Sequence, residues 1–141
     1  MAMCQAVIPQ FRARRAGTIV NVTSSTTLAP FPLVATYTAS KTAIEGFTAS
    51  LEHELNAFGV RAKLVVPGYG PSTSFAANGQ QRMQGLIPAA YESFAHRVFS
   101  GFDKVSEVTK PADVAEGIWQ AANDTSDQLR FPVGADAIAL A

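Results

Sequence analysis

Short runs rich in branched apolar residues alternate with helical segments along this chain, and this alternation restricts the fold more than any other feature. Three runs predict buried strands because they are short and bounded by turn-forming residues: 18–22 (TIVNV), 60–66 (VRAKLVV) and 129–133 (LRFPV). Helical periodicity predicts helices over 2–14, 36–58 and 112–122, with Gly17, Gly59 and Pro111 at their boundaries. A helix before each strand, with short joints, indicates an α/β fold in which helices cover a parallel sheet.

The predicted sheet is small for a fold of this class. A parallel sheet has to be buried on both faces, and this chain of 141 residues opens directly on a helix and supplies only three predicted strands. Residues 69–108 are rich in loops and contain short helical pieces. We therefore expect a single, incomplete α/β domain over residues 1–141.

Composition and charge narrow the possible partners and locations. Apolar residues make up 48% of the chain and charged residues 16%, which is a globular composition. Eleven basic residues balance eleven acidic ones, so neither nucleic acid nor a membrane surface is an expected partner. No apolar run approaches the roughly 18 residues that span a bilayer, and the amino terminus lacks a signal-peptide pattern. The single cysteine, Cys4, fits a reducing compartment, and we predict a cytoplasmic location.

Three side chains that can handle protons lie close together in the sequence. Tyr37 and Lys41 fall one turn apart on the apolar side of the 36–58 helix, where a polar group needs a partner. A nearby ammonium favours tyrosinate, so such a tyrosine can pass a proton near neutral pH. Ser24 follows the 18–22 strand, at the end where open α/β sheets bind ligands. Together these residues predict a catalytic site, whereas Ser24 alone favours a loop hydroxyl that bonds to backbone.

Three motifs carry a resemblance to a known family. The run GTIVNVTSS at 17–25, followed by YTASK at 37–41 and VVPG at 65–68, resembles the short-chain dehydrogenase/reductase family. The resemblance covers essentially the whole chain as the carboxyl-terminal part of such an enzyme, and it implies a partial Rossmann-like parallel sheet with flanking helices. It also implies that Ser24 polarises the substrate oxygen, Tyr37 is the acid/base, and Lys41 assists Tyr37 and binds the nicotinamide ribose.

The same resemblance assigns cofactor contacts to the run PGYGPST. The residues it implies as cofactor-binding are Tyr37, Lys41, Pro67, Gly68, Gly70, Ser72 and Thr73. A backbone group at Gly70 and the hydroxyl of Ser72 or Thr73 would hold the nicotinamide carboxamide, although a plain turn is equally compatible with this run. Residues 69–108 would form the substrate lid. His53 and His96 show no metal-ligand spacing, so we predict no metal site.

These observations support a leading hypothesis and an alternative. The leading hypothesis is hydride transfer between NAD or NADP and a small alcohol or ketone substrate, with the choice between the two cofactors unreadable here. The sequence contains neither G-x-x-x-G-x-G nor G-x-G-x-x-G, so the alternative is a catalytically inactive truncated fragment that acts only by association. A serine hydrolase fits poorly because the sequence has no G-x-S-x-G motif.

Small residues line the side of the 36–58 helix opposite Tyr37, and they are Ala39, Ala43, Gly46, Ser50 and Ala57. Small side chains let helices approach closely, so this stripe predicts a homo-oligomer that forms through the helix, as in the family's dimers and tetramers. Packing within one subunit is the alternative. Trp119, on the 112–122 helix, is predicted to lie in the core.

Overall fold

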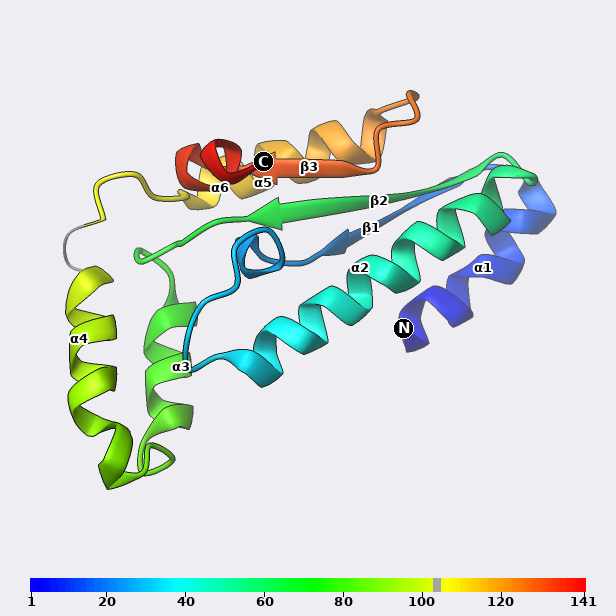
Figure 1. Cartoon of the computed structure of the whole chain (residues 1–141). Helices are drawn as coiled ribbons and strands as arrows, with labels where there is room; N and C mark the ends of the chain where they lie inside the picture. The colour runs from blue at the N-terminus through cyan, green and yellow to red at the C-terminus, as the bar shows by residue number, and fades with distance from the viewer. Residues whose placement is uncertain (103–104) are drawn as a thin grey trace.

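The computed structural model describes residues 1–102 and 105–141, and it contains a three-stranded parallel sheet in the order β1-β2-β3 (Figure 1). The strands are β1 (Gly17–Val22), β2 (Val60–Pro67) and β3 (Arg130–Val133). Val22 of β1 pairs with Val65 of the central strand. Because this pairing is parallel, the carboxyl ends of β1 and β2 lie side by side at one edge of the sheet.

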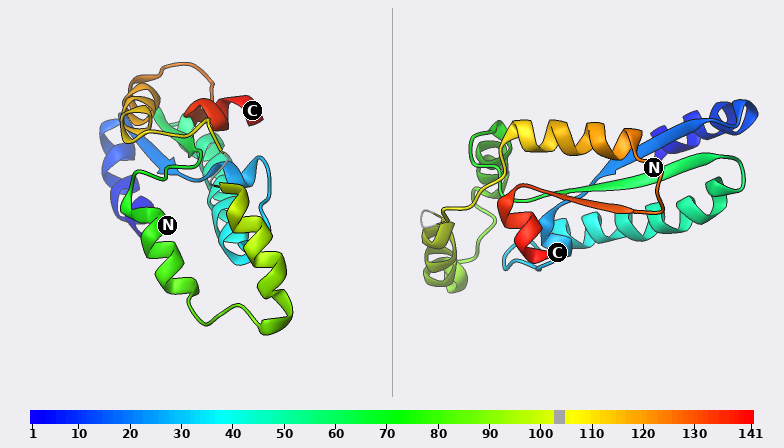
Figure 2. Two further views of the ribbon diagram at one scale, coloured as in Figure 1. Left: turned by 90° about the vertical axis from the view of Figure 1, so that its left-hand side faces the viewer. Right: turned by 90° about the horizontal axis from the view of Figure 1, so that it is seen from above.

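Helices cover both faces of the sheet, with α2 and α5 on opposite sides (Figure 2). The helices α1 (Ala2–Arg14) and α2 (Ala35–Asn56) share one apolar cluster with Val60 of β2. The helix α5 (Pro111–Asn123) packs against a second cluster that includes Val65. Both faces of β2 are therefore buried, as a central parallel strand requires.

Residues 70–102 and 105–108, here named the arm, extend away from the carboxyl ends of the strands (Figure 1). The arm contains α3 (Ser74–Met83), the short 3-10 turn η2 (Ala89–Tyr91) and α4 (Glu92–Phe102). Residues 103 and 104, which belong to the predicted 69–108 lid, lie outside the described residues. Two further short elements are η1 (Ser25–Thr27), which follows β1, and α6 (Ala135–Leu140), which follows β3.

The predicted α/β class and element order are confirmed, with boundaries that shift by one or two residues. The prediction that Trp119 lies in the core is wrong, because 64% of this residue is exposed. Gly117 and Ala121 form the buried face of α5 instead, and Trp119 projects from the opposite side of the helix. Helix α6 was not anticipated, since six residues are too few to show a helical period.

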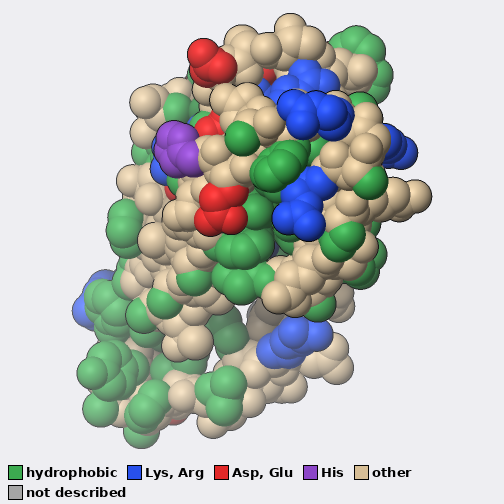
Figure 3. All heavy atoms as spheres, turned by 90° about the vertical axis from the view of Figure 1, so that its right-hand side faces the viewer, with side chains coloured by type: hydrophobic (Ala, Val, Ile, Leu, Met, Phe, Trp, Pro, Cys, Tyr) green, Lys and Arg blue, Asp and Glu red, His purple; other side chains and the backbone are tan. Residues whose placement is uncertain are grey.

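The opposite end of the molecule, where β1 and β2 begin, shows Lys and Arg side chains among apolar ones (Figure 3). The last turn and C-cap of α1 supply Arg12, Arg14 and Arg15. The Arg12 guanidinium lies 5.6 Å from the centre of the Phe58 ring, and Arg15 donates a hydrogen bond to the Ala57 carbonyl at 3.2 Å. These arginines therefore pack against the end of α2. Within residues 1–102 and 105–141, no helix is both long enough and apolar enough to cross a membrane.

Candidate active site

The candidate site lies where β1 and β2 end beside each other. The Thr23 N–H donates to the Val65 carbonyl at 2.8 Å, so the chain leaving β1 stays attached to β2 for one further residue. Ser24 follows at once, and Pro67 ends the neighbouring strand. The site residues predicted after β1 and those predicted after β2 therefore begin at the same end of the sheet.

Tyr37 and Lys41 lie one turn apart near the start of α2, and both are half-buried. The Lys41 ammonium donates to the carbonyl of Val22, the last residue of β1, at 3.2 Å. It also lies 5.7 Å from the centre of the Tyr37 ring. Partial burial lowers the pKa of Lys41, because desolvation disfavours its charged form. Helix α2 thus places the phenol and the ammonium at the end of β1.

Ser24 is half-buried and forms the N-cap of η1. Its Oγ accepts a hydrogen bond from the Thr26 N–H at 3.3 Å. A hydroxyl that accepts one bond still has its own proton to donate. Ser24 can therefore cap η1 and also donate to an oxygen atom of a bound molecule.

A buried carboxylate holds the loop that carries Ser24. Glu45 of α2 accepts hydrogen bonds from the hydroxyls of Thr23 at 3.2 Å and Thr27 at 2.5 Å. Its second oxygen pairs with Arg130 Nε of β3 at 3.1 Å. Glu45 thus joins α2 to both sides of Ser24 and to β3. No local pattern marks Glu45 as a site residue, since its partner Arg130 lies 85 residues away in the chain.

The loop after β2 carries the remaining predicted residues. Gly68 follows β2 directly, whereas Ser72 and Thr73 lie further out, where the arm begins, and both are exposed. The Thr73 hydroxyl caps α3: it accepts from the Phe75 N–H at 3.3 Å and donates to the Gly70 carbonyl at 2.9 Å. The Thr73 hydroxyl is therefore engaged in capping α3, which makes Ser72 the better placed of the two candidate hydroxyls to bond a ligand.

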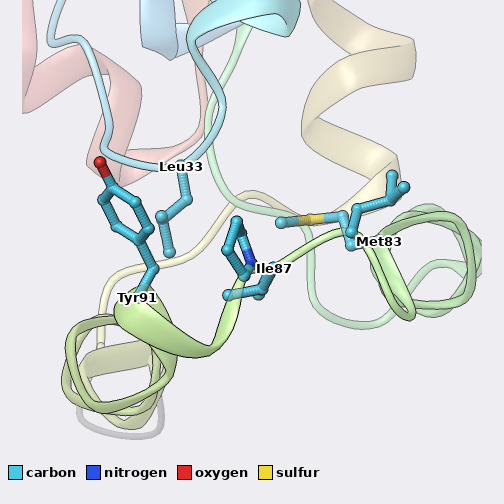
Figure 4. A pocket seen from close by; sticks show the side chains of 6 residues that line it. Leu33, Met83, Ile87 and Tyr91 are labelled. Carbon is cyan, nitrogen blue, oxygen red and sulfur yellow. The ribbon is translucent and has the colours of Figure 1, made fainter.

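An apolar groove of about 290 Å³ separates the loop before α2 from the arm (Figure 4). Its lining residues are Leu33, Met83, Leu86, Ile87, Pro88 and Tyr91. None of these side chains carries a charge, and the only polar side-chain group among them is the Tyr91 hydroxyl. The arm also reaches Tyr37, because the rings of Tyr37 and Phe75 lie 6.1 Å apart between centres. The groove and Tyr37 therefore both border the arm, the groove through the loop before α2 and Tyr37 through its ring contact with Phe75.

Known proteins resemble this chain in sequence. A family model described as short chain dehydrogenase matches residues 1–83. An uncharacterized oxidoreductase of Schizosaccharomyces pombe is 34% identical over 135 residues, which cover 95% of this chain and 56% of that protein. The chain spans about half the length of the relatives it matches.

Solved structures agree with the fold. A short-chain dehydrogenase from Streptomyces avermitilis superposes with a TM-score of 0.73 at 26% identity, covering 98% of this chain and 49% of that one. A 3-oxoacyl-[acyl-carrier protein] reductase from Brucella melitensis with bound NAD superposes with a TM-score of 0.61 at 26% identity, over 92% of this chain and 45% of that one. Both neighbours are about twice as long as this chain.

Proposed function

This chain belongs to the short-chain dehydrogenase family, and from that premise we propose that it serves NAD(P)(H)-dependent interconversion of an alcohol and a ketone, with Tyr37 as the acid/base. The observation that carries the proposal is the position of Lys41, bonded to the end of β1 and 5.7 Å from the Tyr37 ring. This position brings a phenol, an ammonium and the Ser24 loop to one strand end.

The residues present fit the nicotinamide end of the cofactor. The Lys41 ammonium and the Tyr37 hydroxyl are suited to a ribose. The Gly68 N–H is already bonded to Thr109 Oγ1, and the Asp136 carboxylate lies against Gly68, so Gly70 is the glycine of the loop after β2 that we assign to the cofactor. When bound, the nicotinamide supplies or accepts the hydride. Ser72 is suited to hold its carboxamide, because the Thr73 hydroxyl caps α3. The preference between NAD and NADP is not assigned.

This chain's own residues handle the substrate oxygen and its proton. The Ser24 hydroxyl donates a hydrogen bond to the ketone oxygen and orients it. Tyr37 then donates its phenolic proton to that oxygen as the alcohol forms, and it takes the proton back in the reverse reaction. The Lys41 ammonium lies 5.7 Å from the centre of the Tyr37 ring, so its positive charge offsets part of the negative charge that develops during the transfer.

The uncharged groove predicts an apolar substrate body. A charged group placed against these side chains would lose its hydration without gaining a partner. We expect kcat/KM for uncharged aliphatic or aromatic ketones to exceed that for 2-oxo acids of similar size by at least about tenfold. The assay is NAD(P)H oxidation followed by absorbance over a panel of both classes. Equal or better use of the 2-oxo acids would contradict the apolar assignment, and a lack of turnover with every member would count against the reductase itself.

The small-residue stripe of α2 supports a homo-oligomer. All five of its residues are exposed, and a hollow of about 620 Å³ at its amino-terminal end is lined by residues that include Ala39 and Ala43. We expect Ala43→Arg to shift the protein to monomer in size-exclusion chromatography with light scattering, because a long charged side chain prevents close helix contact. Asn56→Arg, on another side of the same helix, is the matched control and should leave the assembly intact. A wild-type monomer, or an Ala43→Arg oligomer, would argue against this interface.

The alternative is an inactive fragment that acts only by association. It differs from the reductase in its response to cofactor. An inactive fragment would leave the fluorescence of NADH and NADPH unchanged on mixing, while it still assembled through α2.

A further inference from the structure

A carboxylate outside the candidate catalytic residues joins three distant segments of the chain. Asp136, in the first turn of α6, accepts a hydrogen bond from the Tyr69 N–H at 2.5 Å through Oδ2. Its Oδ1 accepts from the Thr109 hydroxyl at 2.7 Å. Tyr69 comes just before the arm, and Thr109 comes just after it. One side chain therefore binds both ends of the arm.

The two ends of the arm are also bonded to each other. The Thr109 N–H donates to the Tyr69 carbonyl at 2.7 Å, and the Thr109 Oγ1 accepts from the Gly68 N–H at 3.0 Å. The same hydroxyl lies 3.1 Å from the Val133 carbonyl, a second acceptor. Only 2% of Thr109 is exposed, so these bonds form away from water. Thr109 thus links the ends of β2 and β3 to the place where the arm joins the sheet.

Close packing at this point leaves room for glycine only. A Cβ added to Gly68 would overlap the Asp136 carboxylate, and one added to Gly134 would overlap the Thr109 side chain. Gly134 also has a φ of 89°, a conformation that residues with a side chain rarely adopt. We name Gly68, Tyr69, Thr109, Gly134 and Asp136 the Asp136 cluster. The close packing within this cluster indicates that the loop after β2 follows one specific backbone path.

We propose that Asp136 and Thr109 are positioning residues that fix both ends of the arm and the path of the 67–70 loop beside the candidate active site. In this arrangement α6 sets where the arm starts and returns, and so it sets how α3 lies against Tyr37. The role of the 67–70 loop in holding nicotinamide rests on the proposed function, but the mechanical role of the cluster does not. The two can therefore be tested separately.

Amide hydrogen exchange of the isotope-labelled protein, read by NMR, tests the mechanical role without any turnover. In Asp136→Ala we expect the Tyr69 and Thr109 amides to exchange about tenfold faster than in the wild type. The Thr23 amide, bonded between β1 and β2, should change by less than twofold. Trypsin should also cut faster after Arg82 and Arg97 in the arm, while cutting after Arg61 in β2 stays slow. Asp127→Ala, which removes an exposed carboxylate, is the matched control and should behave as the wild type.

Thr109 gives a second, conservative pair of variants, which decides the matter if Asp136→Ala does not fold. Thr109→Val removes the hydroxyl at nearly constant volume and should speed exchange at Tyr69, whereas Thr109→Ser keeps the hydroxyl and should restore protection. The proposal is overturned if the Thr23 amide accelerates as much as the Tyr69 amide, since that result means a uniform loss of stability. It is also overturned if Tyr69 and Thr109 stay protected in the variants. Failure of hydride transfer in every assay would leave the exchange result unaffected.

Discussion

Replacing Tyr37 by phenylalanine is expected to lower the rate of ketone reduction by NAD(P)H about 10²–10⁴-fold, the range that a positioned general acid contributes. The substitution removes the phenolic hydroxyl and keeps the ring, so the contact with Phe75 at 6.1 Å can persist. Lys41 would keep its bond to the end of β1. The loss should therefore fall on the proton-transfer step, with the fold unchanged. Initial rates of NAD(P)H oxidation measure this loss. The assay uses the form of the protein that reduces a ketone, which is either this chain alone or a longer protein that contains it.

Ser100→Ala is the control for this substitution. It removes a hydroxyl from an exposed position of α4 in the arm, where the hydroxyl donates to the Arg97 carbonyl at 3.1 Å. We expect its rate to stay within about threefold of the wild type, because Ser100 is not among the residues that line the groove. Retention of NAD(P)H oxidation by Tyr37→Phe would exclude Tyr37 as the acid/base, and an equal loss in both variants would indicate general damage to the arm.

The element order could be predicted because it depends on local signals. Branched apolar runs bounded by glycine and proline mark β1 and β2, and Pro111 marks the start of α5. These signals act over a few residues, so they survive even in a chain that spans about half of its relatives. The juxtaposition of Tyr37 and Lys41 was equally accessible, since a helix places residues four apart on one side.

The parts that sequence could not supply depend on contacts between distant residues. A helical wheel of α2 predicts an apolar stripe, but the buried face also contains Glu45 and Thr48. Their partners lie on β1 and β3, and no periodic pattern links residues 45 and 130. The same holds for Asp136, whose partners lie 27 and 67 residues away. Trp119 lies on the side of α5 that faces away from the core, and only the packing of the helix on the sheet determines which side that is.

The buried position of Glu45 makes it the residue whose loss should most disturb the Ser24 loop. Its side chain is 10% exposed, and its carboxylate accepts hydrogen bonds from the hydroxyls of Thr23 and Thr27, which lie on either side of Ser24. Each hydroxyl has a second acceptor, the Val65 carbonyl at 3.4 Å for Thr23 and the Ser24 carbonyl at 2.7 Å for Thr27. The Arg130 side chain is 49% exposed, so its ion pair contributes less than about 1 kcal/mol. The main stabilisation therefore comes from the buried hydrogen bonds and from packing.

We expect Glu45→Ala to lower the free energy of unfolding by about 2 kcal/mol, because the second acceptors recover part of the lost hydrogen bonding. Urea unfolding measures this change, and Glu54→Ala, at an exposed position of the same helix, should change it by less than about 0.5 kcal/mol. Glu45→Gln should cost less than Glu45→Ala, since the amide oxygen can still accept from one threonine. In the form of the protein that turns over, Glu45→Ala should also lower kcat at temperatures where the fold persists, since Ser24 is less well fixed. Equal stability of the two alanine variants would show that Glu45 does not anchor the loop.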